Sequence, residues 1–262
     1  MTYNLRKNVM NAKEVVATMW QALMTAADPA AIETYVDANY RQHSPYVKDG
    51  PQGLRELVDG LRPDYRYELV RIIGEGEFAV MHGIHHNWLN GVFSGGEAVV
   101  GFDMFRVANN RIAEHWDASV PLITASVSGR SQLEGATQVE RPHLTATSES
   151  VAENYVKTVL IGRELDRIGE FVAPDVLQHS LEIGDGIDSL KAALAKTRYE
   201  YKKIHHVIAE GEFVAVHCEG EVHKNTYTFW DLFRLDEQLR IAEQWHVAAV
   251  FPDVVVHTNG AF

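Results

Sequence analysis

The sequence has a single cysteine and no long apolar run. Cys218 is the only cysteine among 262 residues, so no disulfide forms within the chain and a reducing compartment is expected. No apolar run approaches the roughly 18 residues of a membrane span. Residues 1–8 also lack the apolar core of a signal peptide. These absences predict a soluble, cytoplasmic protein that does not enter membranes.

Basic residues are also scarce relative to acidic ones. The chain has 24 Lys and Arg against 36 Asp and Glu, which gives a formal charge of -12. A nucleic-acid partner needs a concentrated Lys/Arg footprint, so this balance argues against nucleic-acid binding. Apolar residues make up 46% of the chain, and 262 residues suffice for two domains of about 130 residues, each with its own core.

Motifs in the first half recur in the second at a nearly constant distance, which falls from 136 to 128 positions along the chain. Such an offset predicts a tandem duplication with loops of different length. Small polar residues dominate between the copies, so we expect domains at 1–127 and 148–262 and a linker at 128–147. The matched pairs are His43 and His179, Glu75–Phe78 and Glu210–Phe213, His82 and His217, Asp103 and Asp231, and Arg111–Trp116 and Arg240–Trp245.

Each copy reads as helices followed by antiparallel strands, an α+β plan in which a curved sheet wraps a helix. Residues 40–49, which carry His43, are expected to be irregular or a short extended piece. The helices are expected at about 11–23, 29–36 and 53–61, then near 148–160 and 189–196. The strands are expected at 67–73, 78–88, 98–107 and 111–120, then at 199–208, 213–222, 226–235 and 240–250.

Two β-prone runs between Phe102 and Asp117 flank an Asn-Asn pair, which tolerates the left-handed backbone of a tight turn. A reversal centred on Asn110 sets Asp103 opposite Asp117. A shift of half a residue pairs Asp103 with Trp116 instead, and the sequence leaves this register open. If both carboxyls face an apolar pocket, their repulsion and burial raise one pKa and place an acid beside a base. The alternative is that Asp103 caps a loop or pairs with a surface arginine.

Several histidines accompany these carboxyls. His43 and His179 follow a short helix and either polarise a substrate carbonyl or make structural hydrogen bonds. His82 and His217 lie among apolar strand neighbours, so they are either ligand contacts or core residues. His82 and His85 point to opposite faces of one strand and cannot share a metal ion. No metal is therefore expected.

Four strings together resemble the SnoaL-like polyketide cyclase family, within the nuclear transport factor 2-like, ketosteroid isomerase-like superfamily. They are Tyr40–Pro45 with Asp49 and Gly50, His82–His85, Asp103–Arg106 and Glu114–Asp117. The resemblance implies two cone-shaped domains, each of three helices in a curved, mostly antiparallel sheet with an apolar mouth. It also implies that Asp117 is the proton shuttle, while Asp103 stands where the cyclases tend to have histidine. In the second copy His246 replaces Asp117, so the two pockets are not expected to run the same proton chemistry.

The resemblance suggests a cofactor-independent acid/base enzyme that acts on a small or medium apolar carbonyl compound by aldol-type cyclisation, isomerisation or dehydration through an enolate. The alternative is a non-catalytic protein that binds a small hydrophobic ligand. Trp116 and Trp245 are expected on the outer sheet faces, where the two copies would form an intramolecular pseudo-dimer, and a further homodimer is left open. The catalytic candidates are Asp117, Asp103 and His43, and the ligand-binding candidates are His82, Tyr40, Phe105, His179, His217, Asp231 and His246.

Overall fold

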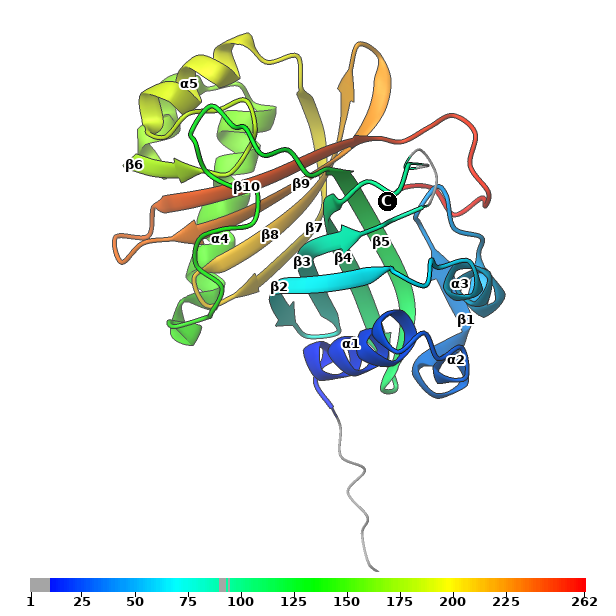
Figure 1. The fold of residues 1–262 in the computed structure, drawn as a ribbon. Coiled ribbons are helices and arrows are strands. Elements are labelled where there is room, and N and C mark those ends of the chain that lie inside the picture. Colours follow the sequence, from blue (N-terminus) through cyan, green and yellow to red (C-terminus); the bar gives the residue numbers. More distant parts are fainter. Residues whose placement is uncertain (1–9, 90–92, 94) are drawn as a thin grey trace, which may run out of the picture.

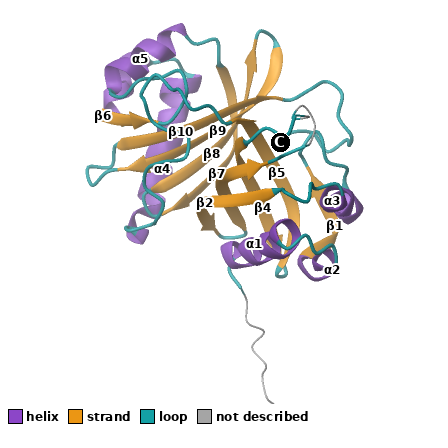
Figure 2. Ribbon diagram, in the orientation of Figure 1, coloured by secondary structure: helices purple, strands orange, loops and turns teal. Residues whose placement is uncertain are grey.

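The computed structural model describes residues 10–89, 93 and 95–262, which form two five-stranded sheets (Figures 1 and 2). The helices of each copy cover the face of its sheet that is turned away from the other sheet. The strand orders are β1-β5-β4-β3-β2 and β6-β10-β9-β8-β7. The second sheet thus repeats the connectivity of the first, as a tandem duplication requires. The predicted α+β plan with two copies is confirmed, and the exact boundaries 127 and 148 remain a prediction.

The first copy begins with a helix fixed by a capping box, in which Asn11 and Glu14 each accept a backbone N–H of the other. This helix and the π-helical turn after it pack their apolar side into the hollow of the sheet. The helices are α1 (Ala12–Trp20), the π-helical turn Gln21–Thr25, α2 (Ala31–Tyr35) and α3 (Gly50–Asp59). The strands are β1 (Val36–Gln42), β2 (Arg66–Glu75), β3 (Phe78–His86), β4 (Val99–Ala108) and β5 (Arg111–Pro121).

The second copy repeats this arrangement around its own core, in which Cys218 is fully buried. None of the helices in the described part of the chain is long and apolar enough to span a membrane. The helices are the 3-10 turns Pro142–Leu144 and Leu165–Glu170, α4 (Thr145–Tyr155), the π-helical turn Val156–Ile161 and α5 (Ile187–Lys196). The strands are β6 (Val172–Gln178), β7 (Glu200–Glu210), β8 (Phe213–Val222), β9 (Asn225–Leu235) and β10 (Ile241–Val250).

The segment expected to be irregular or a short extended piece begins extended. Residues from Val36 to Gln42 form β1, which pairs parallel with the edge of β5, so each sheet is mixed rather than a simple meander. This strand shows no clean alternation, because its register shifts between Val36 and Arg41 and three of its seven residues are exposed. The same parallel edge strand, β6, recurs in the second copy.

The hairpin of β4 and β5 sets the register that the sequence left open. Asn109 and Asn110 both have positive φ, 54° and 62°, as a two-residue hairpin turn of this hand requires. Asp103 pairs with Asp117, and Trp116 pairs with Met104. The turn is centred between Asn109 and Asn110, because Ala108 pairs with Arg111, and a β-bulge between Arg106 and Val107 brings the two carboxyls onto one face of the sheet. The predicted pairing of Asp103 with Asp117 is therefore confirmed, and the predicted turn centre at Asn110 is wrong.

The two sheets pack against each other through their outer faces. Trp116 and Trp245 belong to this shared core, as predicted, together with Phe102, Trp230 and small apolar side chains. On the rim of this core the two copies carry the same cluster. In the first copy, Nε2 of His43 donates to the carboxylate of Glu114, and the imidazole stacks on Trp116 with ring centroids 4.6 Å apart. In the second copy, His179 makes the same contacts with Glu243 and Trp245. The chain is thus a pseudo-dimer held by its own duplication.

Each copy sends the segment after its last strand across to the other copy, as the red C-terminal tail shows in Figure 1. The carbonyl of Gly260 lies 3.0 Å from Nδ1 of His43, and the carbonyl of Ser131 lies 2.7 Å from Nδ1 of His179. These reciprocal contacts repeat the approximate twofold symmetry of the sheets. The segment predicted to be a plain linker therefore forms part of the interface between the copies.

Three histidines between the sheets make stability depend on pH. Burial, and secondarily neighbouring cationic groups, lowers the pKa of His82 and His217 and lowers the pKa of His206 to about 4. Below about pH 6.5 these histidines bind protons in the unfolded chain but stay neutral in the folded chain. The free energy of unfolding is therefore highest above this pH and falls as the pH drops below it. We expect the free energy of unfolding to drop between pH 7.5 and 5.5 by up to roughly 1.4 kcal/mol per pH unit for each histidine. Urea unfolding across this range measures the change in the free energy of unfolding with pH. His206→Asn should reduce this change, while His223→Gln, at an exposed histidine, should not. A free energy of unfolding that does not change with pH would contradict the prediction.

Candidate functional site

The paired carboxyls face a cavity inside the first copy, between its sheet and its helices. Polar groups lie on the sheet side, and the opposite walls are apolar. The space wide enough for the centre of a water molecule is about 40 Å³, so this inner cavity is nearly closed. The polar lining residues are Gln42, His85, Asp103, His115, Asp117 and Ser119, and the apolar ones include Trp20, Leu23, Leu54, Trp88, Phe105 and Ile112.

Asp103 is held ionised at the bottom of this cavity. Its carboxylate oxygens lie 3.2 Å from Nε2 of His115 and 3.6 Å from Nε2 of His85, and it is only 5% exposed. Burial alone would raise the pKa of Asp103, but the hydrogen bonds and charges of the two imidazoles outweigh it and hold the pKa well below its usual range. Asp103 is therefore a fixed negative charge.

His115 connects Asp103 to the edge strand. Its Nδ1 lies 2.9 Å from Oε1 of Gln42, an oxygen that also accepts the backbone N–H groups of His43 and Ser44. These two donors fix the orientation of the Gln42 amide, so Nδ1 of His115 must donate. Its Nε2 faces the Asp103 carboxylate, and only the doubly protonated ring satisfies both acceptors. Hydrogen-bond accounting thus favours an imidazolium–carboxylate pair.

Asp117 has the opposite environment. Burial is the main cause that raises its pKa, and the negative charge of Asp103 adds to it, while the charge of His115 works against both. Unlike Asp103, it is partly exposed. The two carboxyls therefore differ in proton affinity, which is the condition for one acid and one base role at a single site. The acid-beside-base role of the pair stays a prediction.

Asp117 also opens onto a larger vestibule of about 430 Å³ between the two copies. Trp88, Asp117 and Ser119 line both spaces, so they form the passage from the vestibule to the inner cavity. The first copy contributes Tyr46 and Phe93 to the vestibule, and the second contributes β9 and β10 through residues such as Tyr227 and Val250. The mouth of the first site is therefore built by both copies.

Trp20 supplies a polar group to the otherwise apolar helix side of the cavity. Its indole Nε1 is buried and has no hydrogen-bond partner among the described residues. Its ring packs against Tyr67, His85 and Phe105 at centroid distances of 4.8 to 5.9 Å, so it is held in place. Because indole only donates, a bound molecule with an oxygen at this position would satisfy it.

The second copy keeps the buried carboxylate and changes its surroundings. Asp231 occupies the place of Asp103, but its partners are Tyr201, Gln244 and His246. His246 lines a cavity of about 360 Å³. Two of the predicted ligand-binding residues, Asp231 and His246, are thus hydrogen-bonded to each other. Phe105, another predicted ligand-binding residue, lines the inner cavity of the first copy together with Asp103 and Asp117.

His43, one of the three catalytic candidates, lines the vestibule but does not contact Asp103. His43 lies on the opposite side of β5, where Glu114 engages its Nε2 at 2.9 Å and Gly260 engages its Nδ1. It follows an edge strand whose last residues pair with Glu114 and His115, so it reaches the face of Trp116 and not that of Asp117. His179, predicted to bind ligand, takes the matching structural position against Glu243.

His82 and His217 also turn away from the cavities. His82 accepts a hydrogen bond from the guanidinium of Arg71 at 2.6 Å and stacks on Phe102. His217 forms a hydrogen bond with the hydroxyl of Thr228 and stacks on Trp230. Both belong to the interface between the sheets, which corrects their prediction as ligand contacts. Tyr40 is buried and its hydroxyl accepts from Nε2 of Gln42, so it supports the site from behind. Sequence reasoning missed His85, His115, Gln42 and Trp20 as site residues.

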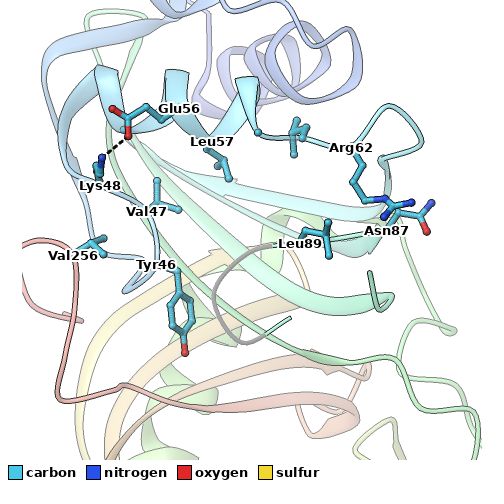
Figure 3. A pocket seen from close by; sticks show the side chains of 12 residues that line it. Tyr46, Val47, Lys48, Glu56, Leu57, Arg62, Asn87, Leu89 and Val256 are labelled. Atoms are coloured by element: carbon cyan, nitrogen blue, oxygen red, sulfur yellow. Dashed lines mark ion pairs between the residues drawn. The ribbon is translucent and has the colours of Figure 1, made fainter. Parts of the chain in front are cut away.

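A further hollow of the first copy lies over α3 and is open to solvent (Figure 3). Its wall includes the ion pair of Lys48 and Glu56 at 2.7 Å, with Leu57 and Leu89 across the opening. Neither carboxyl of the pair lines it. Tyr46 separates it from the vestibule, so it is a neighbouring groove and not the candidate site.

Comparison with known proteins gives one family match. The family model of the SnoaL-like domain matches residues 16–115, which lie in the first copy. No curated protein matched the sequence. Among solved structures, TsrD from Streptomyces laurentii is similar at 21% identity over 41% of this chain and 87% of its own, with a TM-score of 0.36. IdmH, a polyketide cyclase candidate from Streptomyces antibioticus, is similar at 16% identity over 42% and 92%, with a TM-score of 0.35. An LEH-like epoxide hydrolase from M. tuberculosis is similar at 18% identity over 40% and 84%, with a TM-score of 0.33.

Proposed function

We propose that the SnoaL-like domain of this chain is a cofactor-independent acid/base enzyme that forms an enolate from a small or medium apolar carbonyl compound. The observation that carries this is the cross-strand pair of Asp103 and Asp117 on one apolar cavity, with one pKa lowered and the other raised. Aldol-type cyclisation, isomerisation and dehydration all begin with this step.

Asp117 acts as the base. A carboxylate oxygen of Asp117 takes the proton from the carbon next to the carbonyl. The electron pair of that C–H bond forms the carbon–carbon double bond of the enolate, and the π pair of the carbonyl moves to its oxygen. The raised pKa makes Asp117 a stronger base than an ordinary carboxylate, and its place in the passage brings it to the substrate from the vestibule.

Two other groups assist in this proposal. Trp20 Nε1 donates a hydrogen bond to the oxygen that gains the charge, which is the electrostatic support that an enolate needs. Asp103 does not contact the reacting atoms. It stays ionised between His85 and His115, and its charge holds up the proton affinity of Asp117.

The alternative is a protein that binds an apolar ligand without converting it. The near closure of the inner cavity favours it, because a ligand confined to the vestibule would meet Asp117 only at its edge. In that case the carboxyl pair serves the fold.

Exchange of α-protons for deuterium separates the two functions. 2-Tetralone, an apolar bicyclic ketone, is incubated with the full chain in D2O, and loss of its α-proton signals is followed by NMR. The enzyme proposal expects saturable acceleration over buffer. Saturable binding of 2-tetralone without faster exchange would overturn it and support the binding protein.

A further inference from the structure

We propose that the second copy holds a separate acid–base site in which His246, oriented by Asp231, takes a proton from an enolisable carbonyl compound with an apolar body. The proposal does not depend on the chemistry of the first copy, because it uses other residues and another cavity.

The orientation of His246 is fixed by a buried network. Its Nδ1 lies 2.9 Å from Oδ1 of Asp231, which also accepts Nε2 of Gln244 at 3.0 Å. The other oxygen of Asp231 accepts the hydroxyl of Tyr201 at 2.8 Å. Burial, and then the charge of Asp231, raises the pKa of Tyr201 well above its ordinary value, so Tyr201 stays a donor. Asp231, 1% exposed, therefore receives three hydrogen bonds as a carboxylate.

This network selects one tautomer of His246. Because Nδ1 faces a carboxylate, Nδ1 carries the proton and Nε2 carries the lone pair. Nε2 is buried and has no hydrogen-bond partner among the described residues. An imidazole held by a carboxylate with its other nitrogen unpaired is the arrangement of a general base, and imidazole is the side chain that exchanges protons near neutral pH.

The cavity that His246 lines is suited to an apolar ligand. Tyr199, Tyr201 and His246 line its sheet side, and leucines of the outer helices, including Leu160, Leu190 and Leu194, line the other side. Space for the centre of a water molecule is about 360 Å³, against about 40 Å³ in the inner cavity of the first copy. The second copy therefore has a cavity of its own, comparable in volume to the vestibule of about 430 Å³ at the first site.

The proposed step is balanced within the site. Nε2 of His246 forms the new N–H bond and the C–H bond of the ligand breaks. The electron pair of the C–H bond forms the carbon–carbon double bond of the enolate, and the π pair of the carbonyl moves to its oxygen. The imidazolium formed is stabilised by Asp231 at 2.9 Å. Return of a solvent-exchanged deuteron to the carbon completes the exchange.

The test uses α-proton exchange of 2-tetralone by the full chain that carries Asp117→Asn, so that the first site is silent. Adding His246→Gln should slow the remaining exchange by about 10²- to 10⁴-fold, since this is what a positioned base contributes. The matched control is His223→Gln, an exposed histidine in the same copy, which should leave the rate unchanged. Circular dichroism shows whether each variant folds, and Tyr201→Phe, which keeps His246, should lower the rate less.

Three outcomes decide the proposal. Exchange by D117N that His246→Gln removes supports it, whatever the contribution of Asp117. Exchange by D117N that persists in the double variant overturns it, and so does the absence of any exchange by D117N while the chain with only His246→Gln remains active. In the last case the proposed function of the first copy stands alone.

Discussion

Replacing Asp117 by asparagine in the chain that carries His246→Gln is expected to slow α-proton exchange of 2-tetralone by about 10²- to 10⁴-fold. Asparagine keeps the size of the side chain and its hydrogen-bonding oxygen but cannot accept the proton. Because Asp117 is partly exposed and its pKa is raised in the folded chain, losing its charge should not destabilise folding. NMR measures the rate, and urea unfolding measures stability in the same variants.

The matched control for this prediction is Asp59→Asn, the same change at an exposed carboxylate at the end of α3. It should leave exchange and stability unchanged. An Asp117→Asn chain that exchanges at the rate of its parent would remove Asp117 from the reaction. A fall in rate accompanied by unfolding would instead show that the carboxyl serves the fold.

Sequence reasoning reached the hairpin because its turn depends on a local signal, the two asparagines that adopt positive φ. A two-residue turn with strict alternation would set Asp103 opposite Trp116, and it is the β-bulge between Arg106 and Val107 that brings Asp103 opposite Asp117. The duplication and the position of Trp116 and Trp245 between the sheets follow from the same local patterns. The parallel edge strand β1 could not be predicted from local patterns, because its partner β5 lies about 75 positions away and the register between the two strands is irregular.

The partners of the carboxyls could be inferred less well, since they depend on tertiary contacts. Residue 115 is the one position in the motif Arg111–Trp116 where the copies differ, histidine against Gln244. That difference could have identified His115 as a site residue, although it was missed. In the structure each of the two side chains contacts the buried carboxylate of its copy. His43 misled because its repetition as His179 fits a site as well as an interface, and only the face reached by the edge strand distinguishes them.

The second large effect is expected at the clusters that join the copies. Glu243 is 2% exposed and accepts Nε of Arg234 at 2.7 Å, while Nε2 of His179 lies 2.8 Å away. The charges of these partners and their hydrogen bonds hold the pKa of Glu243 below its usual range despite burial. Glu243→Gln leaves the guanidinium of Arg234, which is 22% exposed, without its counter-charge. It should therefore lower the free energy of unfolding by about 3 kcal/mol, the lower end of the cost of breaking a buried ion pair, because water partly screens Arg234.

Glu114 provides the matched comparison within the same chain. It makes the same contacts, with Arg106 and His43 each at 2.9 Å, but its side chain is 13% exposed. Water screens the remaining charges there, so Glu114→Gln should cost clearly less than Glu243→Gln. Because the two sheets share one core, a single unfolding transition is expected in urea, and its midpoint and slope measure both losses. Equal losses would mean that burial does not decide the strength of these clusters, and a loss below about 1 kcal/mol at Glu243 would contradict the prediction that its ion pair stabilises the second copy.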